Sequence, residues 1–521
     1  MTATISILAT IPGYTPNGWR YSTLSSDAYK FSMMAGGRPL EDECFHLSFR
    51  RGGMVYMPVD IDTVVEGMQP TVSDATLDAE TEYLNANGFP VKREWLENIT
   101  MGAWATVYST PKGEYACPRE PVATIRAAQA LDSWLEPMLI GRISYQMQVA
   151  TAYLNACSTG THDAFNETVK TVTCEEQKRL TLEAIAGCYP NGGGEEDVSF
   201  YRDFIQVDEV GYYNAVQAQC RKMLATGVKA HRFFEVGLRA ATCMDQHLIA
   251  LKAMKDMGFT KTSNVYGAWL LGMTPVGTMG HEGVMRWGGD DELAFRKHRD
   301  VLPKVTFLLD TNDTLNIGLP IALKLMLEAP DRMDGARPDS GDLAAQFRIF
   351  VAGQRENGIA RPWIFEDGIN DTMVTGFEAL RNELDYPEDL TLYGAGGFFI
   401  DRCEPTGYTR GRINMIYKLC WTRTYGAAMK FGNEEESGDS GKASLPGIPV
   451  VYVKADDTVS GPAILVGQEC DVLPGYRPFG KGDSKYRQTV PSRPALSGLM
   501  LQIIDTLTKN RVAKIAAARS R

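Results

Sequence analysis

A histidine and two aspartates stand where a series of strands and helices can bring them together. His281 follows the small-residue turn "PVGTMG", Asp310 ends the apolar run "FLLD", and Asp339 lies within "RPDSGD". A histidine near its usual pKa can act as a base or a nucleophile at neutral pH. A carboxylate can accept hydrogen bonds from sugar hydroxyls or stabilise a developing positive charge. These residue types indicate group-transfer or acid–base chemistry, provided that the fold gathers them.

Each of these residues also has a purely structural interpretation. Asp339 is followed by Ser340 and Gly341 and can cap the helix predicted after them, and Asp310 can form a turn. A lone histidine is most often a hydrogen-bonded core residue. No second histidine or cysteine lies at ligand spacing from His281, so we expect no metal site there.

Two further strand ends carry glycines. "FEDGIN" contains Asp367 and Gly368, and "YGAGGFF" contains Gly396 and Gly397. Because glycine has no side chain, backbone amides can approach a phosphate closely at such positions. Phosphate sites are frequent beside the last strands of β/α barrels. A plain turn is the alternative, but we interpret the four residues as candidate phosphate contacts.

Three cations lie near these strand ends. Arg337 precedes Asp339 by two residues, so within a strand both side chains point the same way. Its planar guanidinium suits a carboxylate or an aromatic face. Arg402 and Lys418 follow the glycine cluster, and each is a candidate phosphate partner or a surface charge.

The elements that must position these residues repeat along the segment 231–405. Apolar runs such as "KVTFLLD" and "PWIF" end in polar residues and lead into helical patterns. Repeated strand–helix units predict parallel strands with helical crossovers, and the carboxyl ends of such strands usually carry the chemistry. We therefore expect an α/β fold in which 231–405 is a catalytic barrel.

The remaining chain divides into three segments. We expect residues 1–150 to form an N-terminal α/β layer with short strands and irregular stretches. Residues 151–230 are interpreted as a polar insertion in which "YPNGGGEED" favours a surface loop. Residues 406–521 return to short strands, and we expect them to pack back on the N-terminal domain. The final "KNRVAKIAAARSR", with five cations and no acids, predicts a solvated helix or a local anion contact.

Composition excludes several classes of function. The 521 residues carry a net charge of −11, which argues against nonspecific nucleic-acid binding. No apolar run is long enough to span a membrane, and we expect no secretory signal. The ten cysteines show no C-x-x-C pair or zinc-ligand spacing. We expect reduced thiols in a cytoplasmic protein.

Nine stretches together resemble the nicotinate phosphoribosyltransferase family, in the family's order. They are "SSDAYKFSMM", "FRRGG", "FFEVGLRAA", "GFTKTSNVYGAWLLGMTPVGTMGHE", "FLLDTNDTLNIGLP", "RPDSGDLA", "YGAGGFF", "MIYKL" and "GKASLPG". The resemblance covers most of residues 24–450 except 155–230. The run 233–282 together with "RPDSGD" is specific, whereas no single piece would be.

This resemblance implies a fold and an activity. The fold would be an irregular α/β barrel of the type II phosphoribosyltransferase kind, with an additional α/β sandwich domain built from both chain ends. The enzyme would join nicotinate to phosphoribosyl pyrophosphate, releasing pyrophosphate and forming nicotinate mononucleotide for NAD synthesis. ATP would drive the reaction through a phosphohistidine, Mg²⁺ would assist, and the protein would be a homodimer.

Roles for individual residues are also implied. His281 would be the phosphorylated histidine, and Thr278 would contact substrate in the same turn. Tyr29 would stack on the pyridine ring from the partner subunit, Arg337 would contact that ring, and Asp339 would lie near the ribose. The expected phosphate contacts are Arg50, Gly396, Gly397, Arg402 and Lys418.

Some positions depart from the family pattern. Gly280 stands where nicotinate enzymes usually have alanine, and Pro338 where they commonly have an apolar residue such as leucine. Nicotinamide enzymes have an aspartate at the place of Glu235, so Glu235 matches the nicotinate side. A carboxylate facing an anionic ring would repel it. We therefore expect Glu235 to pair with Arg239, four residues on, and both to border the substrate.

Other functions remain as alternatives. The closest is a nicotinamide phosphoribosyltransferase, and another is a non-catalytic sensor that has kept the nucleotide pocket. An unrelated phosphate-binding barrel such as an aldolase would need a strand-end lysine as Schiff base. Lys304 precedes its strand instead.

Overall fold

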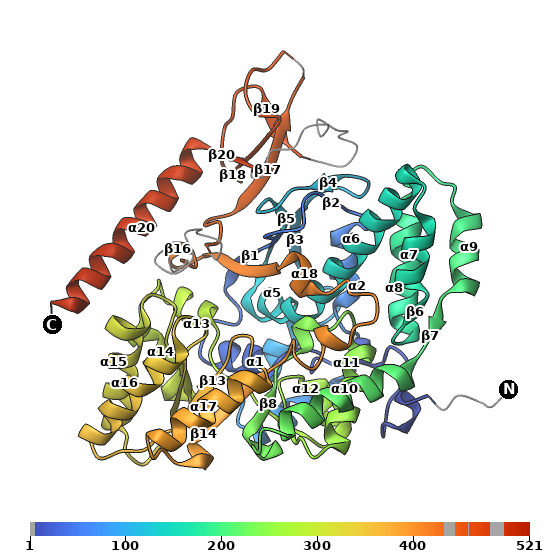
Figure 1. Ribbon diagram of the computed structural model, residues 1–521. Coiled ribbons are helices and arrows are strands. Elements are labelled where there is room, and N and C mark those ends of the chain that lie inside the picture. Colours follow the sequence, from blue (N-terminus) through green and yellow to red (C-terminus); the bar gives the residue numbers. More distant parts are fainter. Residues whose placement is uncertain (1–5, 432–442, 457, 480–493, 521) are drawn as a thin grey trace.

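The computed structural model describes residues 6–431, 443–456, 458–479 and 494–520. Seven parallel strands form a curled half-barrel sheet in the order β10-β9-β8-β14-β13-β12-β11 (Figure 1). The predicted barrel is therefore present as an open half-barrel, and the pairing of β14 with β8 joins its two groups of strands. In sheet order the strands are Thr274–Pro275, Lys261–Thr262, Phe233–Glu235, Thr391–Ala395, Trp363–Phe365, Gly335–Arg337 and Thr306–Leu308.

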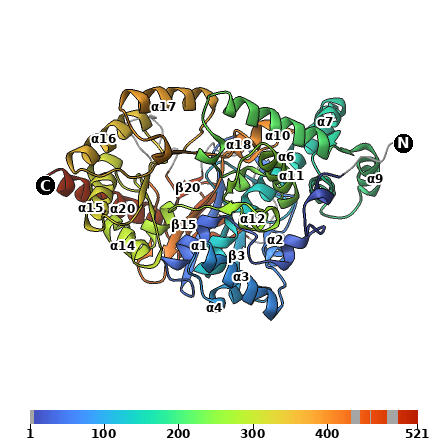
Figure 2. The ribbon, with the colours of Figure 1, turned by 90° about the horizontal axis from the view of Figure 1, so that it is seen from below.

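Helices connect these strands and cover the outside of the sheet, as Figure 2 shows for α14 to α17. In α16 the residues Leu343, Phe347, Phe350 and Val351 recur at helical spacing and are buried, which explains why this segment folds as a helix against the sheet. The barrel helices are α11 Met244–Asp256, α12 Val265–Leu271, α13 His281–Met285, α14 Asp291–Val301, α15 Leu319–Glu328, α16 Leu343–Glu356 and α17 Asp371–Glu383.

A second sheet is built from both ends of the chain, as predicted. Its five antiparallel strands have the order β16-β15-β1-β5-β3. The central strand β1 pairs with β15 on one side and with β5 on the other, and it is buried almost throughout. In sheet order the strands are Gly426–Ala427, Met415–Thr422, Asp42–Phe49, Pro121–Ala128 and Ala105–Ser109.

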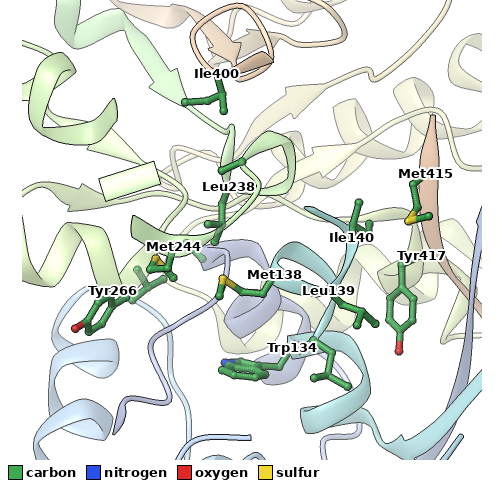
Figure 3. Packing of buried hydrophobic residues seen from close by; sticks show 14 of the residues in the cluster. Trp134, Met138, Leu139, Ile140, Leu238, Met244, Tyr266, Ile400, Met415 and Tyr417 are labelled. Atoms are coloured by element: carbon green, nitrogen blue, oxygen red, sulfur yellow. The ribbon is translucent and has the colours of Figure 1, made fainter. Parts of the chain in front are cut away.

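Helices α5 (Gln129–Trp134) and α6 (Glu136–Thr159) join the barrel to this sheet. Figure 3 shows Trp134 and Met138 between Leu238 and Met244 on the barrel side and Tyr417 on the sheet side. These residues are buried within one continuous apolar cluster. The barrel and the second sheet therefore share a core, and their relative placement is fixed by packing.

The polar segment 151–230 folds largely as helices. The predicted loop at "YPNGGGEED" connects two of them, but the helices around it were missed because their buried faces are narrow. Residues 1–150 likewise contain helices beside their strands. These further elements are α1 Ala28–Ala35, α2 Ile61–Met68, α3 Asp74–Ala86, α4 Arg93–Glu97, α7 His162–Val169, α8 Glu175–Gly187, α9 Glu195–Phe204, α10 Glu209–Leu224 and α18 Arg410–Ile413, with the short strands β2 Val55–Tyr56, β4 Tyr115–Ala116, β6 Thr171–Val172 and β7 Gln206–Val207.

The C-terminal region forms a four-stranded sheet that ends in the long helix α20 (Gly498–Arg519). The four-stranded sheet lies apart from the barrel in Figure 1, on the far side of the five-stranded sheet, and α20 runs back towards the barrel. Among the described helices, none combines the length and the apolar character that crossing a membrane requires. The strands, in sheet order, are β19 Tyr476–Pro478, β17 Pro449–Lys454, β18 Ile464–Gln468 and β20 Ala495–Leu496.

Candidate active site

A cavity of about 340 Å³ lies inside the half-barrel. Its wall is formed by barrel strands and the turns after them, by the start of α1 and by β15. It also reaches residues that precede the strands, such as Lys304 and Met333. The predicted site residues that line it are Tyr29, Arg239, Thr278, His281, Arg337, Asp339 and Lys418.

His281 begins the short helix α13 and has partners on both ring nitrogens. Its Nδ1 lies 3.1 Å from the Thr311 hydroxyl, and its Nε2 contacts the Lys430 ammonium. Burial, followed by Lys430, lowers the pKa of His281 to about 4. Because the lysine can only donate, the neutral ring carries its proton on Nδ1 and keeps a lone pair on Nε2.

The two predicted carboxylates lie beside this ring. The Asp339 carboxylate approaches His281 Nε2 to 3.5 Å and the Asp310 carboxylate to 3.9 Å. Asp310 also accepts a 2.6 Å hydrogen bond from the Ser340 hydroxyl and a 3.2 Å bond from the backbone N–H of Asp339. Asp310 thus holds the turn that presents Asp339, and it does not itself line the cavity.

Helix capping does not explain Asp339. The helix that follows, α16, is capped by Asp342, which accepts a hydrogen bond from the backbone N–H of Ala345. Burial alone would raise the pKa of Asp339, but the cations Arg337 and Lys430 hold it well below its usual range. Asp339 is therefore a persistent negative charge, and its side chain stays 34% exposed.

Arg337 is held rigidly across the cavity wall. It donates to the Glu366 carboxylate at 2.6 Å and to the Met279 carbonyl at 2.8 Å. Its guanidinium also lies 3.5 Å from Asp339. Glu366, which the sequence analysis missed, occupies the position expected for Asp367: it lines the cavity, whereas Asp367 and Gly368 are exposed beyond it.

Tyr29 and Arg239 form a second part of the wall. The Tyr29 hydroxyl donates to Glu136 at 2.6 Å, and the Arg239 guanidinium lies over the Tyr29 ring at 5.6 Å and 3.5 Å from Glu136. Tyr29 lines the cavity of its own chain, and its expected entry into the site of a partner subunit stays a prediction. Gly280 permits this arrangement, because a Cβ there would stand 3.0 Å from the Tyr29 ring.

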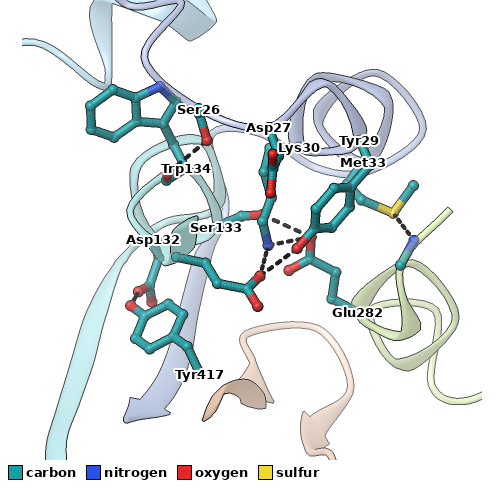
Figure 4. A network of polar contacts seen from close by, with 12 residues as sticks. Ser26, Asp27, Tyr29, Lys30, Met33, Asp132, Ser133, Trp134, Glu282 and Tyr417 are labelled. Carbon is teal, nitrogen blue, oxygen red and sulfur yellow. Dashed lines mark hydrogen bonds and ion pairs between the residues drawn. The ribbon is translucent and has the colours of Figure 1, made fainter. Parts of the chain in front are cut away.

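A buried ionic network supports these residues from behind (Figure 4). Lys30 contacts Glu136 and lies 3.0 Å from Glu282, which also accepts a 2.9 Å hydrogen bond from Ser133. Glu136 binds Tyr29, and Glu282 follows His281 directly in the chain. Lys30 therefore links the aromatic wall to the histidine turn. Buried charges paired in this way constrain geometry, and loss of one partner is costly.

Cations collect at the end of the cavity formed by the five-stranded sheet. Burial lowers the pKa of Lys418 to about 7, and Lys430, Arg239 and Arg50 add to this effect although Glu136 opposes it. Burial and the neighbouring Arg410 likewise lower the pKa of Arg50 to about 10. Mutually repelling cations beside a cavity favour the binding of an anion there.

Glu235 corrects one prediction. It does not pair with Arg239 and does not line the cavity: it is fully buried, accepts a 2.6 Å hydrogen bond from Thr262 and lies 3.1 Å from His247. Side chains alternate along a strand, so Phe234 and Val236 face the cavity and Glu235 faces α11.

Four other predicted phosphate contacts also lie outside the cavity lining: Arg50, Gly396, Gly397 and Arg402. The exposed Arg402 places its guanidinium over the Phe398 ring at 4.8 Å. Gly396 and its neighbour Gly397 follow β14. A Cβ on Gly396 would stand 2.6 Å from the Val236 carbonyl, so this glycine allows β14 to pack against the end of β8.

Lys430 and Thr311 are functional candidates that the sequence analysis missed, together with Glu366. Thr311 had a usable signal, since it directly follows Asp310 at a strand end. Lys430 had none, because it lies in an irregular segment far along the chain. Within the described residues, no group of three or more histidine, cysteine or acidic side chains could hold a metal ion.

The chain is similar to known proteins both in part of its sequence and in its fold. No protein-family model matches the chain. Over 225 residues it is 29% identical to a nicotinate phosphoribosyltransferase from Bacillus subtilis (strain 168), and the match covers 42% of each protein. The matched part thus spans less than half of that relative.

Two solved structures share the architecture over most of the chain. The nicotinate phosphoribosyltransferase from Porphyromonas gingivalis is 15% identical with a TM-score of 0.51, covering 79% of this chain and 93% of that one. The enzyme from Vibrio cholerae is 14% identical with a TM-score of 0.53, covering 80% and 90%. The chain therefore has the fold of solved nicotinate phosphoribosyltransferases, an α/β barrel joined to a sheet domain from both chain ends, as its motifs predicted.

Proposed function

We propose that the protein is a nicotinate phosphoribosyltransferase of NAD synthesis. It transfers phosphoribosyl from phosphoribosyl pyrophosphate to nicotinate, giving nicotinate mononucleotide and pyrophosphate, and it couples this to ATP hydrolysis through His281. The observation that carries the proposal is the cavity inside the half-barrel. An aromatic ring, a guanidinium, an ionised carboxylate, a neutral imidazole and buried cations converge on it.

The nicotinate ring is assigned to the wall made by Tyr29 and Arg239. The Tyr29 ring supplies a stacking face, and Arg239 supplies a planar donor for the carboxylate of the substrate. Displacement at the sugar needs the ring nitrogen to be positioned rather than activated. The acidic residues of the same wall, Asp27 and Glu136, could accept from an amide, which keeps nicotinamide as the competing substrate.

The sugar and its leaving group are assigned to the opposite parts of the cavity. Loss of pyrophosphate builds positive charge on the ribose, which the ionised Asp339 stabilises. The negative charge that develops on the pyrophosphate is met by Lys418, which lines the cavity, and Arg50 adds positive charge outside the lining. Arg337, fixed by Glu366, keeps Asp339 charged and in place.

Mg²⁺ fits this site. It is usually held by one or two carboxylates together with the phosphates of a substrate, and the Asp339 carboxylate, which lines the cavity and whose turn Asp310 holds, would provide such a ligand. When bound, Mg²⁺ would supply positive charge to the pyrophosphate. The protein's own contribution is the charge and orientation of the two aspartates.

ATP coupling is assigned to His281. The Nε2 lone pair would attack the γ-phosphorus of ATP, forming the N–P bond as the bond to the bridging oxygen breaks and ADP leaves. The Nδ1 proton remains directed at Thr311, and Lys430 is placed to bind the transferred phosphoryl oxygens. Hydrolysis of the phosphohistidine by water then restores the ring.

The test is steady-state product formation with nicotinate and nicotinamide side by side, each with and without ATP. We expect nicotinate to be preferred and ATP to stimulate turnover. His281→Ala should lose the stimulation while keeping slow ATP-independent turnover. A clear preference for nicotinamide would overturn the substrate assignment. Equal ATP stimulation in His281→Ala would remove the phosphohistidine, and binding without any turnover would favour a sensor.

A further inference from the structure

The C-terminal helix α20 is attached to the rest of the molecule by few contacts. Of its described residues, Met500, near its start, is the one that is buried, and Leu501 and Val512 are more than half exposed. The helix runs from β20 towards the barrel helices α14 and α15 (Figure 1). Such a helix contributes little to the core, so its specific polar contacts to the barrel call for a reason.

Those contacts reach two barrel loops, which the Asn312 side chain links to each other. Arg511 donates to the Asn312 carbonyl from Nη2 at 2.8 Å and from Nε at 3.2 Å. One helical turn on, Lys514 donates to the Gly289 carbonyl, and the Asn312 side chain donates to the same carbonyl at 2.9 Å. Arg511 thus binds the loop that follows β11 through two hydrogen bonds.

Arg511 also contacts a second segment. Its guanidinium lies over the Phe431 ring, 4.8 Å from the ring centre. Asn312 directly follows Thr311, the partner of His281 Nδ1, and Phe431 directly follows Lys430, the partner of His281 Nε2. One side chain from α20 therefore touches the neighbours of both residues that hold the imidazole.

We propose that Arg511 is a positioning residue for His281. By fixing the 311–312 loop and the 430–431 segment relative to each other, it sets the separation of the hydroxyl and the ammonium between which the ring lies. The inference rests on the proposed phosphoryl transfer to His281. Phosphoryl transfer depends on the alignment of nucleophile and phosphate, and small displacements reduce it steeply.

The critical variant is Arg511→Met, which keeps the length of the side chain and removes its hydrogen bonds and charge. We expect the ratio of ATP-stimulated to ATP-independent turnover to fall by about tenfold, with a higher KM for ATP. ATP-independent turnover should stay within about twofold of wild type, because Arg511 does not line the cavity. Phosphohistidine formed from γ-labelled ATP should fall in parallel.

Three further variants define the result. Lys509→Met removes a cation from the same helix whose described ion pair is with the exposed Asp505, and it should behave as wild type. Arg511→Lys keeps a donor for the Asn312 carbonyl and should restore part of the stimulation. Phe431→Leu should lower stimulation in the same direction, and less than additively when combined with Arg511→Met.

The outcomes separate this inference from the proposed function. Undiminished ATP stimulation in Arg511→Met, in a protein where His281→Ala abolishes it, would overturn the positioning role alone. An equal fall in ATP-independent turnover would show that Arg511 merely supports the fold. If His281→Ala keeps its stimulation, the phosphohistidine itself is lost and the role of Arg511 with it.

Discussion

Among the described residues of the barrel, the buried histidines His247 and His281 each lie beside a carboxylate, and of these two His281 borders the cavity. His247 lies 3.1 Å from Glu235 and 2.9 Å from the Asn264 side chain, and neither His247 nor Glu235 is exposed. His281 lies 3.5 Å from Asp339, whose side chain is 34% exposed. Both pairs combine the same chemical groups at similar distances.

The two pairs differ in whether the carboxylate is fully occupied by protein groups or is accessible from the cavity. Glu235 is occupied by Thr262, His247 and the backbone N–H of Gly237, so it fixes β8, β9 and α11 relative to one another. Asp339 keeps an exposed face towards a cavity. Residue type and separation are therefore insufficient to identify a catalytic pair. Access to a substrate decides whether the pair acts in stability or in chemistry.

The largest expected effect is that of replacing Asp339, the carboxylate that faces the cavity. Asp339→Ala should lower kcat on the order of a thousandfold, as expected for the loss of a preorganised charge at the ribose. The melting temperature should change little, since α16 is capped by Asp342. Asp342→Ala is the matched control, and it should lower stability by about 1 kcal/mol without lowering kcat. If the two variants lost activity equally, Asp339 would be a structural residue.

Replacing the buried carboxylate Glu235 should have the opposite effect: stability should fall, and substrate binding should not change. Glu235→Ala removes one partner of a buried pair and should lower the free energy of unfolding by about 3 kcal/mol. The fraction that remains folded should retain its KM for the pyridine substrate, because Glu235 does not line the cavity. Urea unfolding monitored alongside kinetics will check both values. A changed preference between nicotinate and nicotinamide would instead place Glu235 at the ring.

A third measurement uses pH. The pKa of His281 is lowered to about 4 by burial and Lys430, while Asp310 and Asp339 oppose the shift. Below a pH of about 6.5, His281 takes up a proton in the unfolded chain, whereas the folded ring stays neutral down to a pH of about 4. The contribution of His281 to the free energy of unfolding is therefore fully present above a pH of about 6.5 and is lost as the pH falls towards about 4.

The stability difference between wild type and His281→Gln should therefore shrink by up to about 1.4 kcal/mol per pH unit as the pH falls from about 6.5. Urea unfolding at a series of pH values measures it. His231→Gln, which removes an exposed histidine, controls for the loss of a titratable ring. A constant difference across this range would mean that His281 is protonated in the fold.

The smallest effect is expected at Gly280. A methyl group there would press on the Tyr29 ring from 3.0 Å, which the ring can relieve by moving a few tenths of an ångström. Gly280→Ala should raise the KM for nicotinate by about twofold to fivefold and leave ATP stimulation unchanged. A large fall in ATP stimulation would show that the methyl group disturbs His281 instead.

The sequence predicted the barrel well because its strand–helix units are local patterns. Polar residues at the ends of apolar runs located His281, Asp310, Arg337 and Asp339, which the fold gathers within hydrogen-bonding reach or close to it. The resemblance to a family added Tyr29 to the predicted site residues. No local sequence pattern indicates that Tyr29 lies in the cavity.

Other parts of the site depended on facts that a sequence does not display. The direction of Glu235 follows from which face of a three-residue strand meets the cavity, and a strand that short has no readable alternation. Lys430 reaches His281 only through the pairing of distant segments. The helices of 151–230 were not predicted because their buried faces are narrow. A face with few apolar residues gives only weak helical periodicity in the sequence.

The pairing of β1 with β15 has a consequence for biosynthesis. The strands meet across 376 residues at Cys44 and Cys420, and Phe45 of β1 and Lys418 of β15 both line the cavity. At ordinary rates of translation the ribosome needs roughly 20 to 75 seconds to deliver β15 after β1. A nascent chain therefore carries an open sheet edge for most of its synthesis, and the end of the cavity lined by Lys418 is completed last.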